Sequence, residues 1–379
     1  MKRVYLDYAS TTSVDPKIIE DMMPYLKDDF GNPSSPHYYG QKARKAIEDA
    51  REILANSISA QSEEIIFTSG ATESNNLALF GVARALREKG KHILISSIEH
   101  HSVIRPAQEL KSMGFDVSFI KVDRFGQIDP QDIKSAMTPQ TILVAVMHAS
   151  NEIGTIQPIK EIGMITKAHN VLFLVDACQT VGHLPVNVNE LNCDFLSFSA
   201  HKFYGPKGVG GLYARKGSRL SAWLLGGDQE RNRRASTHNV PGIVGMGKAI
   251  DVCRQQLPGE MQKQTQLRDR LIDFVINNID GSRLNGHPSQ RLPNNAHFSF
   301  EGVDGEALLM SLDMNGFCAS MGSACTSGSL KPSDVLKAIR LSDALALGSL
   351  RVSLGRWSTQ EEIDAFAHQL KKSVEQLRQ

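Results

Sequence analysis

Features that would indicate nucleic acid, a membrane or zinc are missing from this sequence of 379 residues. The 42 basic and 41 acidic residues leave a net charge of +1, so no strong field attracts a polyanion or an acidic membrane. No apolar run approaches the roughly 18 residues of a membrane span, and no secretory signal follows the charged start. CxxC and HExxH motifs are also absent, so a zinc site is not expected. We therefore expect a cytoplasmic protein with no metal site and no direct contact with nucleic acid or a membrane.

Cysteine is scarce, and the 5 residues present are an odd number at irregular spacing. A disulfide framework is therefore not expected. Most of these thiols should be small buried groups, as the apolar surroundings of Cys178 and Cys318 indicate. Cys325 differs, because it stands in MGSACTSGS (321–329), a run of small residues typical of a loop. A thiol in such a loop needs an explanation other than packing.

Internal repeats, low-complexity tracts and linkers rich in glycine and proline are absent as well. From about residue 60 to 215, short apolar runs alternate with helical patterns. Near-continuous apolar strands that alternate with helices predict a parallel sheet covered on both faces. The clearest runs are EIIFTSG (64–70), KHILISS (91–97), TILVAVMHA (141–149), VLFLVDA (171–177) and DFLSFSA (194–200).

The last third of the chain has a different pattern. A long polar helix is predicted over about 243–279, with a break near Pro258. The segments at 295–300 and 349–354 alternate between apolar and polar residues, as half-exposed strands do. A final helix with one apolar face is predicted to begin with a capping box formed by Ser358 and Glu361. This part of the sequence predicts a smaller α+β domain.

Polar residues follow each of the five apolar runs, where parallel strands would end and ligands bind. Lys202 is the most informative, because burying its charge is costly and a lowered pKa makes the amine nucleophilic. SGATES (69–74) offers helix N–H groups that can hold a phosphate. Asp176 alone would be an ordinary helix cap, and His100 alone an ordinary packed histidine. Together, a phosphate cradle, a carboxylate and a lysine at one edge are what pyridoxal phosphate requires.

Long and specific motifs then connect the chain to a known family. They include YLDYASTT (5–12), FTSGATESNNLA (67–78), VDACQTVG (175–182), SFSAHKFYGPKGVG (197–210), SMGSACTSGSL (320–330) and RVSLGRW (351–357). In these motifs the chain resembles the cysteine desulfurases of the NifS/IscS type, within the class V aminotransferase group of fold-type I pyridoxal-phosphate enzymes.

This resemblance implies an α/β fold whose large domain, residues 14–257, holds a mostly parallel seven-stranded sheet. A smaller α+β domain is expected from residues 1–13 and 258–379, and it carries a mobile cysteine loop at about 320–331. The resemblance also implies a homodimer.

Individual roles follow from the same resemblance. Lys202 corresponds to the lysine that forms a Schiff base with pyridoxal phosphate, and Asp176 to the partner of its pyridinium nitrogen. Gln179 corresponds to the group that bonds the phenolic oxygen of the ring. His100 corresponds to the histidine that stacks on the ring and acts as an acid or base. Cys325 corresponds to the catalytic cysteine.

Phosphate contacts are implied for the backbone at Ala71 and for Thr72, Ser199 and His201, and for Thr237 reaching from the other subunit. Asn151 and Arg356 correspond to the groups that hold the substrate carboxylate, for which a bidentate arginine is suited.

The implied reaction converts L-cysteine to L-alanine and leaves the sulfur as a persulfide on Cys325. Lys202 would remove the Cα proton, and His100 would help to form the thiolate. The sulfur would then pass to an acceptor protein, either an iron–sulfur scaffold or a tRNA-thiolation enzyme, with any contact between Cys325 and a cluster being transient. Two alternatives stay open: a selenocysteine lyase or another aminotransferase, and a non-catalytic sulfur-carrier or assembly protein with the same fold.

Two positions depart from the family pattern. Ser10 stands where alanine is usual, and Ser236 stands where glycine is common. If the backbone at Ser236 has a positive φ, serine costs about 1 kcal/mol there.

Overall fold

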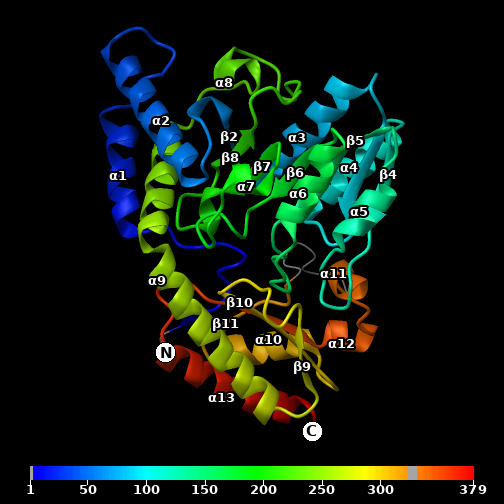
Figure 1. The fold of residues 1–379 in the computed structure, drawn as a ribbon. Helices are drawn as coiled ribbons and strands as arrows, with labels where there is room; N and C mark the ends of the chain where they lie inside the picture. Colours follow the sequence, from blue (N-terminus) through cyan, green and yellow to red (C-terminus); the bar gives the residue numbers. More distant parts are fainter. Residues whose placement is uncertain (1–2, 323–330) are drawn as a thin grey trace.

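The computed structural model describes residues 3–322 and 331–379. Within them, a larger sheet with helices on both sides lies above a smaller group of strands and helices in Figure 1. The expected cysteine loop at about 320–331 falls largely in residues 323–330. These residues, and Cys325 with them, lie outside the described part of the chain.

The larger sheet has seven strands in the order β2-β8-β7-β6-β5-β3-β4. The neighbours from β7 to β4 run parallel, whereas β8 runs antiparallel to both β2 and β7. The predicted mostly parallel sheet is therefore confirmed. Its strands are β2 (Ile65–Thr68), β3 (His92–Ser96), β4 (Asp116–Ile120), β5 (Thr141–Met147), β6 (Leu172–Asp176), β7 (Phe195–Ser199) and β8 (Gly210–Ala214).

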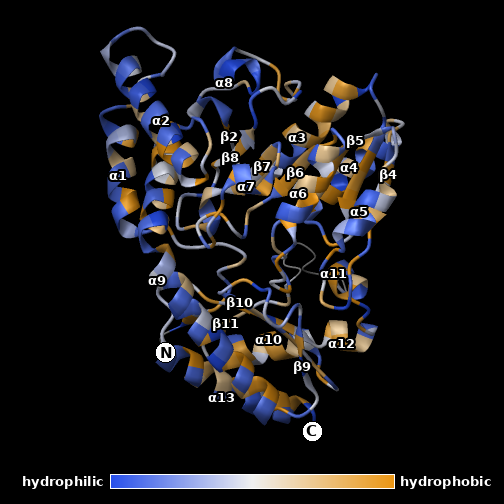
Figure 2. Cartoon of the chain, viewed as in Figure 1, coloured by the Kyte–Doolittle hydropathy of each residue, from blue (hydrophilic) through white to orange (hydrophobic). Residues whose placement is uncertain are grey.

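Alternate residues of one strand enter two apolar clusters, one on each face of this sheet. Val144 and Val146 of β5 belong to the first cluster, and Leu143 and Ala145 to the second. Successive strand residues point to opposite faces, so covering both faces requires the almost wholly apolar strands that Figure 2 shows. The first face is covered by α2 (Tyr38–Ser57), α6 (Ile159–Ala168) and part of α9 (Val240–Asn278), and the second by α3 (Ala71–Leu86) and α4 (His101–Ser112).

The smaller part combines two short sheets with helices around a third apolar cluster, as an α+β unit does. An antiparallel sheet has the strand order β12-β10-β9, and β1 pairs in parallel with β11. Leu6 lies in the third cluster, so residues near the N-terminus pack with the C-terminal part. These elements are β1 (Val4–Tyr5), β9 (Ser282–Asn285), β10 (Asn295–Phe300), α10 (Gly305–Met314), β11 (Phe317–Cys318), β12 (Ser349–Ser353) and α13 (Gln360–Leu377).

The remaining elements are short or lie at the periphery. They are α1 (Pro16–Lys27), η1 (Ser62–Glu64), α5 (Pro130–Ala136), α7 (Val188–Leu191), η2 (Ala200–Lys202), α8 (Gln229–Asn232), α11 (Asp334–Ala338) and α12 (Asp343–Leu347).

Helix α9 links the larger and the smaller part (Figure 1). The break expected near Pro258 is wrong, because the helix continues through this residue. A proline inside a helix costs about 3 kcal/mol. Packing on both sides opposes this cost, since Ile243 and Ile250 lie in the first cluster and Leu267 and Leu271 in the third. The predicted division between residues 257 and 258 thus falls inside α9, and the domain boundaries stay a prediction.

The capping box of α13 lies one residue later than expected. Thr359 and Glu362 form it, because the hydroxyl of Ser358 instead accepts the backbone N–H of Gly355 at 3.0 Å.

A buried ion pair holds the segment around α8 against α2. Both terminal nitrogens of the Arg51 guanidinium donate to Glu230, at 2.7 and 2.8 Å. The carboxylate of Glu230 also accepts from Nε2 of His238 and from the backbone N–H of Phe67. Burial opposes the charge of Glu230, but these donors together lower its pKa from 4.5 to about 2. The carboxylate therefore stabilises the fold as long as it stays ionised.

We expect Glu230→Gln to lower the free energy of unfolding by about 3 kcal/mol at neutral pH. The folded-state pKa is depressed, so this contribution is present above the unfolded pKa of 4.5 and is lost as the pH falls towards 2. Urea unfolding at neutral and acidic pH measures the difference. Glu48→Gln is the matched control, because Glu48 also pairs with Arg51 but its side chain is 51% exposed. An equal loss in both variants would contradict this assignment.

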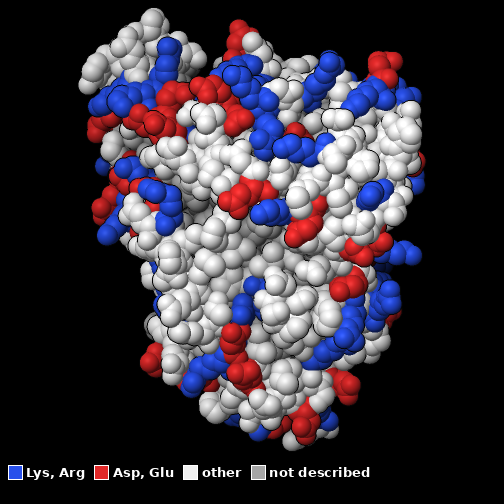
Figure 3. All heavy atoms as spheres, viewed as in Figure 1, with Lys and Arg blue, Asp and Glu red and all other residues white. Residues whose placement is uncertain are grey.

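Among the described residues, no helix is long and apolar enough to cross a membrane. Over the face in Figure 3, Lys and Arg side chains are interspersed with Asp and Glu.

Candidate active site

A cavity of about 960 Å³ opens where β5, β6 and β7 end, and residues of the smaller part also line it. Met147, Asp176 and Ser199, the last residues of these strands, line its wall. Most of the side chains predicted from the sequence meet here. They are Ala71, Thr72, His100, Asn151, Asp176, Gln179, Ser199, His201 and Lys202. Thr237 and Arg356 are not among the lining residues, and Cys325 lies outside the described chain.

Lys202 ends the short helix η2, directly after β7. Its Nζ donates to the carbonyl oxygens of Ala9 and Ser10, at 2.6 and 2.7 Å. Burial lowers the pKa of Lys202 and outweighs the opposing effects of Cys178 and Asp176. A larger fraction of the amine is therefore neutral and able to act as a nucleophile or a base.

Asp176 is held by bonds to both of its carboxylate oxygens. Oδ1 accepts the backbone N–H of Cys178 at 3.0 Å, and Oδ2 accepts from Nδ2 of Asn75 at 2.8 Å. Gln179, one turn further on, donates from Nε2 to the carbonyl oxygen of Ala9 at 3.0 Å. These bonds fix a carboxylate and an amide in the same wall of the cavity.

The N-terminus of α3 forms a cradle that suits a phosphate group. Gly70 precedes the helix with a φ of 155°, a region that favours glycine, and a Cβ there would lie 3.6 Å from Oγ of Ser199. The first residues of the helix, Ala71 and Thr72, face the cavity. Burial lowers the pKa of His201 to about 4, so its ring is neutral at physiological pH. Free N–H groups at a helix start and neutral donors beside them are the chemistry that binds a phosphate.

His100 caps the N-terminus of α4. Its Nδ1 accepts the backbone N–H of Ser102 at 3.1 Å and lies 2.8 Å from Oγ of the same serine. Burial lowers the pKa of His100, partly offset by the nearby carboxylate of Asp176.

The structure places Arg356, the arginine expected to hold the substrate carboxylate, away from the cavity. The guanidinium of Arg356 pairs with Asp15 at 2.8 Å and with Glu260 at 2.5 Å, and it stacks over the ring of Tyr204, with 4.2 Å between Cζ and the ring centroid. Arg356 is therefore already neutralised away from the cavity. Arg351, on β12, lines the cavity instead.

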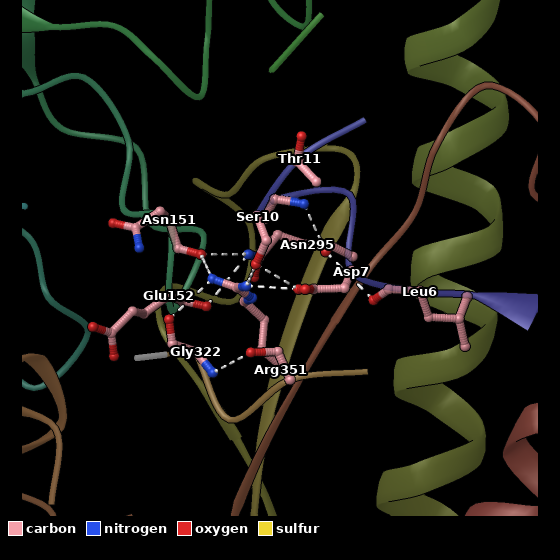
Figure 4. A network of polar contacts seen from close by, with 12 residues as sticks. Leu6, Asp7, Ser10, Thr11, Asn151, Glu152, Asn295, Gly322 and Arg351 are labelled. Atoms are coloured by element: carbon pink, nitrogen blue, oxygen red, sulfur yellow. Dashed lines mark hydrogen bonds and ion pairs between the residues drawn. The ribbon is translucent and has the colours of Figure 1, made fainter. Parts of the chain in front are cut away.

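Arg351 is 1% exposed, and Figure 4 shows its network. Nη1 donates to the carbonyl oxygens of Asn151 and Gly322, at 2.9 and 3.1 Å. Nη2 donates to Oδ1 of Asp7 and to Oγ of Ser10, both at 2.7 Å. Within residues 3–322 and 331–379, Nε of Arg351 has no partner. The motif RVSLGRW contains both arginines, and the signal that separates them is that Arg351 lies inside the strand whereas Arg356 follows it.

Three further residues of the cavity were not predicted as site residues. Oε1 of Glu99 accepts the backbone N–H of Met147 at 2.6 Å, and burial raises the pKa of Glu99 well above its usual value. Burial also raises the pKa of Glu152. Cys178, expected as a packed core thiol, lines the cavity, and burial raises its pKa well above normal. The acidic residues did carry a signal, because each follows an apolar strand within a few residues.

Described residues on both sides of the cysteine segment are tied to this cavity. Before the segment, the carbonyl oxygen of Gly322 accepts from Arg351. After it, the hydroxyl of Ser333 donates to Oε2 of Glu152 at 2.6 Å. Both Gly322 and Ser333 line the cavity.

Comparison with known proteins agrees with this geometry. The family model described as aminotransferase class-V matches residues 4–366. A cysteine desulfurase IscS of Dictyoglomus turgidum is 52% identical over 100% of this chain and 96% of that protein. One of Methanosarcina thermophila is 48% identical over 100% of this chain and 93% of that protein.

Solved structures give the same result. The structure of a NifS-like protein has a TM-score of 0.93 and 35% identity, over 98% of this chain and 99% of that one. The structure of SspA in complex with cysteine has a TM-score of 0.84 and 38% identity, over 94% of this chain and 99% of that one.

The chain therefore belongs to the class V aminotransferases, a family of enzymes that use pyridoxal phosphate. Within this family it is a cysteine desulfurase of the IscS type.

The residues of the cavity fit this cofactor. The glycine-led start of α3 would hold its phosphate, and Asp176 would face its ring nitrogen. Lys202, with its lowered pKa, would supply the amine that the cofactor's aldehyde needs.

Proposed function

We propose that this enzyme removes sulfur from L-cysteine, releases L-alanine, and holds the sulfur as a persulfide on Cys325. The observation that carries the proposal is the single cavity shared by Lys202, Asp176 and Arg351. Gly322 and Ser333, which flank the cysteine segment, line the same cavity. An amine, a carboxylate and a guanidinium around one enclosed space suit an amino-acid substrate with its cofactor.

Chain length supports the role of Cys325. It follows Gly322 by three residues, and three extended residues span at most about 11 Å. The thiol is therefore within reach of the cavity by covalent geometry alone.

We assign the following tasks to the chain's own residues. The bound cofactor supplies an electron sink for the bonds at the substrate's Cα. Arg351, together with Asn151, binds the substrate carboxylate. Nζ of Lys202 would take the Cα proton, and His100, which lines the same cavity, would lie beside the cofactor ring and stabilise the thiolate of Cys325.

The sulfur transfer balances without an external oxidant. The thiolate of Cys325 attacks the substrate sulfur, so that an S–S bond forms and the C–S bond breaks. The electron pair of the C–S bond stays on the carbon, which takes up one proton, the equivalent of the proton lost by the Cys325 thiol. One L-cysteine and one thiol thus give one L-alanine and one persulfide.

Replacement of Cys325 tests this proposal. We expect Cys325→Ala to lose alanine formation from L-cysteine by at least about 100-fold, because no nucleophile then accepts the sulfur. Cys178→Ala is the matched control. Its thiol also lines the cavity, but its raised pKa keeps it protonated, so we expect most of the activity to remain. Full turnover in Cys325→Ala would favour a selenocysteine lyase or another aminotransferase.

We further propose that the enzyme acts as a homodimer in the cytoplasm and delivers sulfur to an iron–sulfur scaffold or a tRNA-thiolation enzyme. Thr237 supports the dimer, because it is exposed and does not line the cavity of its own chain. It is therefore available to the phosphate of a partner's site.

Ser236, beside Thr237, has a φ of 97°, where serine is strained. Contact with neighbouring groups in the dimer would hold this conformation.

A further inference from the structure

A chain of buried hydrogen bonds joins the two residues that would contact the cofactor ring. The side-chain amide of Asn75, on α3, donates to Oδ2 of Asp176 at 2.8 Å and to Oγ of Ser102 at 2.9 Å. Oγ of Ser102, on α4, lies 2.8 Å from Nδ1 of His100. Asn75 is 0% exposed and Ser102 is 7% exposed, so solvent does not compete for these bonds.

The carboxylate of Asp176 determines which group donates and which accepts in each of these bonds. A carboxylate only accepts hydrogen bonds, so the NH₂ group of Asn75 must face it. The same NH₂ group has two protons, and the second one points to Oγ of Ser102. Ser102 therefore accepts from Asn75, and its own hydroxyl proton remains for Nδ1 of His100.

A second donor acts on the same nitrogen. The backbone N–H of Ser102 points at Nδ1 of His100 at 3.1 Å, and a backbone amide cannot reverse its role. A ring nitrogen that accepts carries no proton, so the proton of a neutral imidazole sits on the other nitrogen.

We propose that Asn75 and Ser102 are positioning residues that hold His100 as the neutral tautomer with its proton on Nε2. In this form His100 offers the cavity a hydrogen-bond donor. It can donate from Nε2 to an anionic group bound in the cavity, and it does not take up a proton there, because its only basic nitrogen is turned away towards Ser102. The identity of the group that Nε2 meets in the cavity rests on the proposed function. The tautomer itself follows from the bonds within this chain.

Burial favours the same neutral state. It is the largest influence on the pKa of His100 and lowers it; Asp176 opposes this shift, whereas Lys202 and His101 add to it. Asp176 is also the group whose charge the amide of Asn75 stabilises.

Solid-state nitrogen NMR of the full-length protein with isotope-labelled histidine tests the proposal. Of the 12 histidines, His100 is identified by the signals that disappear in His100→Gln. We expect an unprotonated Nδ1 and a protonated Nε2 at about pH 8, with or without bound pyridoxal phosphate.

Ser102→Ala removes a donor to the neutral ring, and Asn75→Ala removes the bond that directs the Ser102 hydroxyl proton towards that ring. We therefore expect the protonation midpoint of His100 to rise by about one pH unit. The matched controls are Ser112→Ala and Asn76→Ala on the same two helices, whose side chains donate to the carbonyl oxygens of Glu109 and Thr72. These controls should leave the midpoint unchanged.

A proton on Nδ1 in the wild type would overturn the proposal, as would equal midpoints in Ser102→Ala and Ser112→Ala. Failure of the proposed function is distinguishable, because it would appear as missing alanine formation by the wild type and would leave these NMR signals as they are.

Discussion

Lys202→Ala is expected to lose alanine formation by at least about 10³-fold, the largest effect of any single substitution in this enzyme. Two functions disappear together. The amine that bonds the cofactor is lost, and so is the base proposed to take the Cα proton. The bonds from Nζ to the carbonyl oxygens of Ala9 and Ser10 are lost as well. Alanine release from L-cysteine measures the activity, and the visible absorbance of the protein measures covalent attachment of the cofactor.

Lys207→Ala provides the control for this experiment. Lys207 also lines the cavity, but it is exposed and shows no described bond to the groups that would hold the cofactor. We expect it to keep both the absorbance and most of the activity. Equal losses in the two variants would mean that positive charge in the cavity matters and the identity of the lysine does not.

Arg351→Met is expected to lower kcat/KM for L-cysteine by roughly 10²- to 10³-fold, because the positive charge proposed to attract the substrate carboxylate is lost. The effect should depend on the charge of the substrate. Wild type should prefer L-cysteine strongly over its methyl ester, whereas Arg351→Met should treat the two almost alike. Steady-state kinetics with both substrates measures this preference.

The two arginines of RVSLGRW are expected to differ in their effect on substrate binding. Arg356→Met leaves Asp15 and Glu260 without their partner, so we expect about 3 kcal/mol less stability and a kcat/KM within a few-fold of wild type. Arg351→Lys keeps the charge but not the planar fork, and we expect an intermediate kcat/KM. If Arg356→Met instead abolished the preference for L-cysteine over its methyl ester, the assignment of Arg351 would be wrong.

The strands of the larger sheet were predictable from the sequence because both of its faces are buried. Burial on both faces demands uninterrupted apolar runs, and such runs are visible without a structure, as in β5. The residues that follow those runs were predictable as a site for a related reason, which is the parallel direction of the strands. Lys202 and Asp176 end up together because parallel strands finish at one edge.

Other features depend on contacts that no local pattern records. Pro258 predicts a break in α9, yet distant clusters hold the helix on either side of it. Arg351 and Arg356 differ by only five positions, and acidic residues distant in the sequence, Asp15 and Glu260, pair with Arg356 away from the cavity that Arg351 lines. The role of Asn75 follows from its bonds to α4 and β6, which only the folded chain brings together.

The most direct test of the central claim is to find the sulfur after one turnover. The wild-type enzyme is mixed with L-cysteine labelled at sulfur, without reductant, and its peptides are analysed by mass spectrometry. The account predicts one labelled sulfur atom on Cys325 and one L-alanine released for each enzyme chain. Label on Cys178, or L-alanine formed with no labelled sulfur on the protein, would contradict it.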